Sequence, residues 1–116
     1  MSEFIVYSAG FKEQPGMPVE VLEVVREAKR QMLERLTVEE FRIVAANYWF
    51  SYNESEYSPK REWRLGSNFE DGISTAIFDV DSKIWYYREP WEGRDTLVKG
   101  GVAEVVAHLR AFFVDI

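Results

Sequence analysis

Side chains that commonly carry out chemistry are scarce in this chain of 116 residues. It has no cysteine and a single histidine, His108. A disulfide framework, a thiolate nucleophile and a thiolate zinc site are therefore excluded, and one imidazole cannot form a multi-histidine metal site. Pairs of Asp and Glu are numerous and scattered, so none marks an acid–base couple. We expect no catalytic residue, no bound metal, no cofactor and no enzymatic activity.

The sharpest local motif is Asp79-Val80-Asp81, which closes an apolar run. An apolar strand ending in Asp-x-Asp resembles the nucleophile motif of haloacid-dehalogenase-type phosphatases. That resemblance covers six residues, Ser82-Lys83 stands where the family has Gly-Thr, and the rest of the chain is too short for the family's parallel core. Carboxylates before a hairpin are common turn formers, and we expect that role here.

Two further features fit structural roles. Lys99-Gly100-Gly101 precedes an apolar-periodic segment, where free helix amides could hold a phosphate. Its spacing matches neither a P-loop nor a dinucleotide fingerprint, so we expect a flexible joint between a strand and a helix. On a helical wheel, His108 falls at the border of the apolar stripe, which favours a partly solvated position.

Aromatic residues are in clear excess, at 16% of the chain. Tyr and Trp offer large contact area with a polar group and recur at binding hot spots. Many lie near predicted turns among acidic residues, so we predict a surface that binds a partner. Its residues are Tyr52, Glu54, Glu56, Tyr57, Trp63, Glu70, Asp71, Tyr87, Trp91 and Glu92. The alternative is that these rings fill a small core and its sheet.

The N-terminal half predicts one strand and two helices. Residues 3–8 are β-branched and aromatic, as in a short strand. Apolar residues then recur at three- and four-residue steps from Pro18 to Leu36, which predicts an amphipathic helix. Thr37 and Glu40 form a capping-box pattern, and helical spacing behind it predicts a second helix over residues 37–53. Its aromatic and β-branched content would also suit a strand.

The C-terminal half changes to short strands. Residues 60–65, 73–80 and 83–89 predict three strands, with a tight hairpin at Asp81-Ser82, and 95–98 an optional fourth. An apolar stripe from Val102 to Phe113 predicts a closing helix. The order β-α-α-β-β-β-(β)-α indicates a single α+β domain over residues 1–116, with an antiparallel sheet of three to five strands packed against about three helices.

The order of features from Phe69 onward is similar to the C-terminal half of the SUKH superfamily. Residues 69–72 precede the strand 77–80 and the strand 83–87, and the helix from Val102 closes the segment. Many members of that superfamily are immunity proteins of bacterial polymorphic toxin systems. The resemblance implies a stoichiometric inhibitor that binds a toxin and blocks its active site.

The formal net charge of −6 disfavours nucleic acid and anionic lipid and favours a basic protein partner. We therefore expect a protein-binding module, an immunity-type inhibitor of a basic toxin or nuclease. The alternative is a small-molecule-binding domain or minor enzyme with a pocket between sheet and helices. The N-terminus lacks a secretory pattern and no apolar run reaches about 18 residues, so we expect a cytoplasmic protein, either monomeric or homodimeric.

Overall fold

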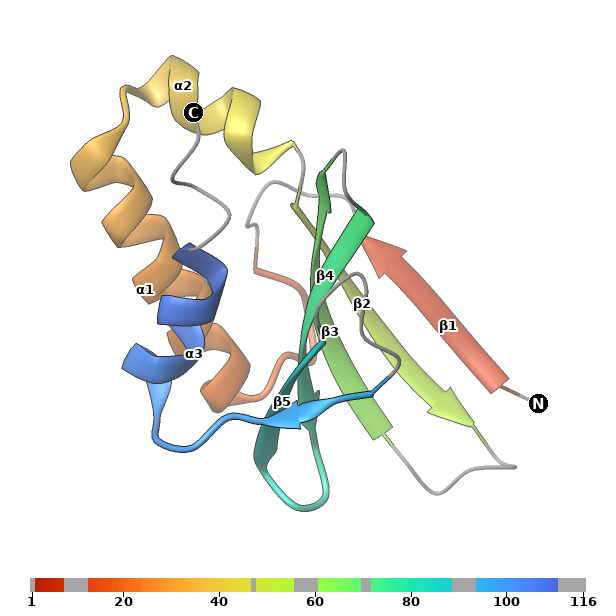
Figure 1. Ribbon diagram of the computed structural model, residues 1–116. Coiled ribbons are helices and arrows are strands. Elements are labelled where there is room, and N and C mark those ends of the chain that lie inside the picture. The colour runs from red at the N-terminus through yellow and green to blue at the C-terminus, as the bar shows by residue number, and fades with distance from the viewer. Residues whose placement is uncertain are drawn as a thin grey trace.

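The computed structural model describes residues 2–7, 13–46, 48–55, 61–69, 72–88 and 94–110. It contains a six-stranded sheet and three helices (Figure 1). The strands are β1 (Ser2–Tyr7), β2 (Tyr48–Ser55), β3 (Arg61–Phe69), β4 (Gly72–Asp79), β5 (Ile84–Arg88) and β6 (Thr96–Leu97), and the helices are α1 (Val19–Arg35), α2 (Val38–Ala45) and α3 (Val102–Arg110).

The sheet is antiparallel throughout, and its strands lie in the order β1-β2-β3-β4-β5-β6. Each strand therefore neighbours the next one along the chain. This arrangement confirms the α+β class and the antiparallel sheet with three helices. The optional strand at 95–98 is present as β6, which has two residues.

The helix predicted over residues 37–53 is wrong in its second half. The capping box is present, because Glu40 N–H donates to Thr37 Oγ1 at 3.2 Å and Thr37 N–H donates to Glu40 Oε1 at 2.9 Å. However, α2 ends at Ala45, and the chain from Tyr48 onward forms β2. In β2, Tyr48 and Phe50 face the core as alternate residues of a strand. The sequence suggested a helix because Tyr48 and Tyr52 are also four residues apart.

Helix α1 packs one apolar stripe against the sheet and exposes a charged face. Val21, Val24, Val25, Ala28 and Met32 are buried along the stripe. On the other face, charged side chains three and four residues apart form ion pairs. This division explains why a 17-residue amphipathic segment could be predicted from its periodicity alone.

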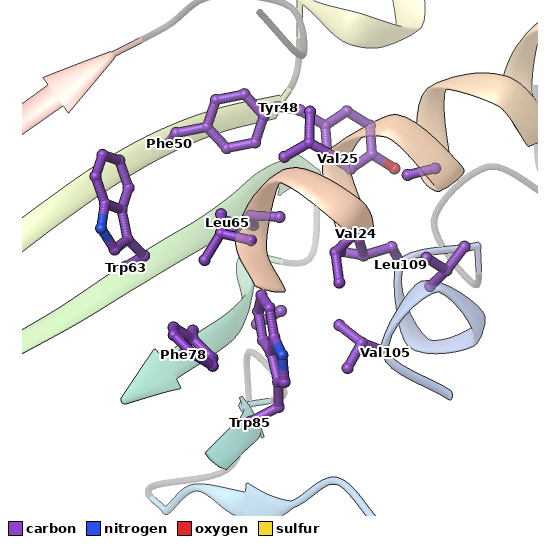
Figure 2. Packing of buried hydrophobic residues seen from close by; sticks show 14 of the residues in the cluster. Val24, Val25, Tyr48, Phe50, Trp63, Leu65, Phe78, Trp85, Val105 and Leu109 are labelled. Atoms are coloured by element: carbon purple, nitrogen blue, oxygen red, sulfur yellow. The ribbon is translucent and has the colours of Figure 1, made fainter. Parts of the chain in front are cut away.

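The core lies between the sheet and the helices, with α1 and α3 on the same side of the strands (Figure 1). Val105 and Leu109 of α3 point toward the same cluster as Val24 of α1 and Trp85 of β5 (Figure 2). Alternate sheet residues supply the opposite wall of this core, namely Tyr48, Phe50, Trp63, Leu65, Ala76, Phe78, Trp85 and Tyr87.

The other face of the sheet is covered by its own side chains at the centre. Trp49 lies directly over Gly66, where a Cβ atom would overlap the indole ring. Arg64 and Glu62 form an ion pair along β3, with 3.0 Å between Nη2 and Oε2. Ile77 is 2% exposed on this face, so β4 carries buried apolar side chains on both of its faces.

Candidate binding pocket

An open pocket of about 290 Å³ lies between the sheet and the segment that leads into α1. It is at the end of the sheet where β3 begins and where the turn between β4 and β5 lies. Its lining residues are Pro15, Gly16, Pro18, Tyr52, Arg61, Trp63 and Val80.

One wall is a turn whose sequence dictates its shape. Met17 N–H donates to the carbonyl of Gln14 at 3.3 Å, which closes a four-residue turn. Pro15 occupies its second position and Gly16 its third, where φ is +86°. A type II turn has this pattern, because proline fixes the first φ and glycine tolerates the positive one. Met17 is buried in the core, so the turn is held against the body of the protein.

Pro18 continues this wall and marks the start of α1. It is the N-cap residue, with φ −63° and ψ 157°, and its carbonyl accepts from Leu22 N–H at 3.0 Å. Proline is suited to a helix start because it has no N–H to leave unpaired. Val19, the next residue, is 59% exposed, so apolar surface continues along the chain beyond the pocket.

Two aromatic rings from neighbouring strands form the floor. Tyr52 of β2 and Trp63 of β3 are register partners, and their ring centroids lie 5.2 Å apart with an angle of 47° between the planes. This tilted contact is a favourable aromatic geometry. Trp63 is 4% exposed and Tyr52 is half-buried, so the tyrosine presents more of its surface. Figure 2 shows Trp63 on β3 within the buried cluster.

The rim carries an ion pair that joins β3 to the β4–β5 turn. Arg61 Nη2 donates to Asp81 Oδ1 at 2.5 Å, and this hydrogen bond lowers the pKa of the Asp81 carboxyl. Val80 N–H donates to the Arg61 carbonyl at 2.9 Å, which fixes Val80 at the pocket. Both charged side chains are about half exposed, at 45% and 51%, so solvent screens the pair and a ligand can compete for it.

The turn beside this rim uses the Asp-x-Asp motif structurally. Asp79 Oδ1 accepts from the backbone N–H groups of Asp81 at 3.0 Å and Ser82 at 3.3 Å. Lys83 completes the turn with φ +59°. Asp79 therefore shapes the hairpin, as we expected for a carboxylate before a tight turn.

Two of the ten residues predicted to bind a partner meet in this pocket. They are Tyr52 and Trp63. Glu54 is placed by the backbone register opposite Arg61, at the same end of the sheet. Tyr87 lies elsewhere, 5% exposed in the core, with its ring stacked on His108 at 4.6 Å between centroids. Tyr87 therefore does not line this pocket, and its burial fits the alternative that the rings fill the core. Glu56, Tyr57, Glu70, Asp71, Trp91 and Glu92 lie outside the described residues.

Five lining residues were not singled out as site residues by the sequence. Pro15, Gly16 and Pro18 gave a loop and helix-start signal, and Arg61 and Val80 gave only strand signals. A Pro-Gly turn is readable locally, but the sheet surface that it faces depends on the path of α1 across the strands. The signal that could have located the pocket is the pairing of Tyr52 with Trp63 across adjacent strands.

In the segment Lys99-Gly100-Gly101, a side chain of the protein itself binds the backbone amide that could have held a phosphate. Gly101 N–H donates to Glu104 Oε2 at 2.7 Å, and Gly100 has φ +114°. Within the described ranges, no group of three or more His, Cys, Asp or Glu side chains could hold a metal ion. No helix among the described residues has the length and apolar character needed to span a membrane.

Comparisons of the chain with family models, curated proteins and solved structures return no match.

Proposed function

We propose that this protein is a binding module that uses the pocket of Tyr52 and Trp63 to anchor a partner protein. The observation that carries the proposal is the pairing of these two rings with two prolines in an open, mainly apolar pocket. Rigid aromatic side chains around a concave site are typical of binding hot spots. The immunity-type mode, in which the bound partner is a toxin whose active site is blocked, is the finer form of this proposal.

The size of the pocket favours a side chain over a larger ligand. Its volume of about 290 Å³ lies at the lower end of small-molecule sites, which commonly measure roughly 300–1,000 Å³. It would hold about ten water molecules at ~30 Å³ each. An apolar or aromatic side chain of a partner would fit within it, whereas a nucleotide-sized ligand would extend into solvent.

The charge of the chain favours a basic partner. A net charge of −6 speeds the approach of a positively charged protein at low salt and slows the approach of nucleic acid. In this proposal, the pocket anchors the partner, and the negative charge of the chain raises the association rate and favours basic partners. The inhibitor would act by covering the partner's active site, with no reaction of its own.

A second candidate is favoured by the position of the same pocket. It lies between the sheet and the segment entering α1, which is where a small-molecule-binding domain would hold a ligand. A metabolite that binds only the folded state raises the melting temperature as its concentration rises. Because the pocket measures about 290 Å³, a ligand of this kind would have to be small.

The test uses the products of the reading frames that neighbour the gene as candidate partners. Their affinity for the wild-type protein is measured by calorimetry, and growth rescue is measured on co-expression. Val80→Phe places a larger side chain in the pocket while keeping the backbone bond to Arg61, and Tyr52→Ala removes the more exposed ring. We expect each to weaken binding at least tenfold and to reduce rescue in parallel.

Ile43→Ser is the matched control, because Ile43 is 71% exposed on α2, beyond the opposite end of α1. It should leave affinity within twofold, and circular dichroism should show the native spectrum for all three variants. Equal binding by wild type and Val80→Phe would refute the pocket as the anchor. A metabolite that stabilises wild type but not Val80→Phe, with no protein partner bound, would favour the second candidate.

A further inference from the structure

We infer that the outer edge of β1 takes an extended, basic segment of a partner protein, which adds a strand to the sheet. This surface is distinct from the pocket, and the inference goes beyond the function proposed for the pocket. Among the described residues, β1 has a neighbouring strand on one side only, and it borders the sheet in Figure 1. Peptides that bind by strand addition gain affinity from the backbone groups of such an edge.

The direction of the backbone groups can be followed strand by strand from a hydrogen bond between β3 and β4. Val80 N–H donates to the Arg61 carbonyl at 2.9 Å, one step beyond the register pair Glu62–Asp79. At Arg61 the backbone groups of β3 therefore point toward β4. These directions alternate along a strand, so the groups of Glu62 point toward β2 and its register partner Asn53. Asn53 in turn directs its own groups toward β3.

The same alternation identifies the β1 residues that face the outer edge. Asn53 pairs in register with Phe4. Because Asn53 directs its groups toward β3, this is a pair without hydrogen bonds, and the N–H and carbonyl of Phe4 point away from β2. Ser2 and Val6, two residues to either side, point the same way. The outer edge thus presents the N–H and the carbonyl of these three residues in one row.

This edge lacks the features that usually prevent strands from pairing. Strand β1 has six residues, contains neither lysine nor proline, and keeps an unbroken register with β2. Natural sheets commonly protect their edges with short strands, lysine, proline or bulges. The opposite edge has such protection, because β6 has only two residues. Of the two edges, β1 is therefore the one suited to an added strand.

The charges in register at this edge favour a basic segment. Glu3 of β1 lies directly opposite Glu54 of β2, and like charges in such a pair are unfavourable. Glu3 directs its backbone toward β2, so it forms a pair without hydrogen bonds with an added strand, where Cα atoms approach to about 4.5 Å. A lysine or arginine at that position would offset the two carboxylates. A second copy of this chain would instead add its own net charge of −6.

The probe is an acetylated and amidated hexapeptide in which lysine and threonine alternate. When a lysine lies opposite Glu3, the threonine N–H groups point toward β1 and the lysine N–H groups point away. Two matched controls of the same sequence and charge carry N-methyl groups on all threonines or on all lysines. Amide signals and hydrogen exchange of the intact chain, labelled with nitrogen-15, report binding.

We expect the unmethylated and the lysine-methylated peptides to shift the Phe4 and Val6 amide signals saturably and to slow the exchange of these amides. The threonine-methylated peptide should bind at least fivefold more weakly. Equal affinity for the two methylated peptides, or shifts that leave Phe4 and Val6 unmoved, would overturn the inference. Dimers of the chain alone in which these two amides are protected would also overturn it, because the occupant would then be a second copy.

Two matched variants test the edge from the side of the protein. Phe4→Pro and Phe4→Ala both remove the phenyl ring, but only the proline removes the outward N–H, which β2 does not use. Phe4→Pro should therefore weaken the peptide at least fivefold relative to Phe4→Ala, and Glu3→Gln should weaken it at least twofold. Equal binding by the proline and alanine variants, both with the native circular dichroism spectrum, would refute the edge; the methylated peptides decide the question if the proline variant unfolds.

Val80→Phe separates this surface from the pocket. It fills the pocket and leaves β1 unchanged, so the affinity for the peptide should stay within twofold of the wild type. A loss of peptide binding in Val80→Phe would place the peptide in the pocket and overturn the edge assignment. A peptide that fails at the edge leaves the proposed function standing if a partner protein still binds wild type and is weakened by Val80→Phe.

Discussion

Replacing Gly66 with alanine tests the way the outer face of the sheet is built. Gly66 lies in β3, paired with Trp49 on β2 and with Thr75 on β4, so its backbone is held from both sides. A Cβ atom at this position would come within 2.5 Å of Trp49 Cη2 and closer still to two other ring atoms. The nearest ring atom, Trp49 Cζ2, would lie 2.0 Å from the Cβ. Ordinary carbon–carbon contacts are about 3.5–4.0 Å, so the indole must move by about 1.5 Å or more.

This displacement sets the expected size of the effect. Inserting a methyl group into a packed site costs about 1–3 kcal/mol. Removing a glycine from a strand returns about 0.5–1 kcal/mol, because the unfolded chain loses freedom. We therefore expect Gly66→Ala to lower the free energy of unfolding by about 1–2 kcal/mol, which corresponds to a melting temperature lower by roughly 3–12 °C for a domain of this size.

The assay is urea denaturation followed by circular dichroism, applied to a double-mutant cycle with Trp49→Ala. In the Trp49→Ala background the overlap is gone, so Gly66→Ala should be neutral or stabilising by up to about 1 kcal/mol. An equal cost in both backgrounds would refute the reasoning, because the loss would then come from the β3 backbone. A stabilising effect of Gly66→Ala in the parent protein would also refute the reasoning.

Three further predictions concern helix ends and charge. Thr37→Ala should cost about 1 kcal/mol of unfolding free energy, since it removes the hydroxyl of an N-terminal cap; no change in the denaturation midpoint would argue against the cap in solution. Gly101→Ser should add a few tenths of a kcal/mol in the same assay, because Glu104 already binds the Gly101 amide and a hydroxyl would complete the capping box. Hydrogen bonds led by that from Arg30 lower the pKa of Glu27 from 4.5 to about 2. The stabilisation from this ionised carboxylate is thus present above pH 4.5 and fades as the pH falls toward 2. Glu27→Gln should therefore flatten the dependence of the unfolding free energy on pH in that window. An unchanged dependence in the variant, or an NMR titration of Glu27 near 4.5, would contradict this prediction.

The elements that the sequence predicted well are those whose signal is local. Thr37 and Glu40 are three residues apart, and their hydrogen bonds form within one helical turn, so the start of α2 could be read directly. Helix α1 repeats its apolar step over 17 residues, which leaves little room for another interpretation. Both predictions depended on contacts inside one element.

The junction of α2 and β2 was predicted wrongly because two periods overlap there. Ala45, Tyr48 and Tyr52 are three and four residues apart, as on a helix face, while Tyr48, Phe50 and Tyr52 also alternate as on a strand. Pairing with β3 decides between these patterns, and this contact joins residues that are distant in the chain. Propensity alone favoured the strand but could not locate the end of the helix.

The candidate site was predicted in part for the same reason. Tyr52 and Trp63 were chosen as aromatic residues near turns, and the β2–β3 register brings them into contact. The prolines that face them belong to a segment more than 30 residues earlier in the sequence. Only the path of α1 across the sheet brings that segment to the rings, and no local pattern encodes this path.

The serial strand order has a consequence for how the chain folds. From β2 to β6, each strand pairs with the next across a short connection, of 2 residues between β3 and β4 and 4 between β4 and β5. These hairpins can form one after another with little loss of chain entropy. By contrast, β1 joins β2 across 40 residues, from 8 to 47, which include α1 and α2. We therefore expect β1 to pair late in folding and to detach first on unfolding, so its amide hydrogens should exchange before those of β3 and β4.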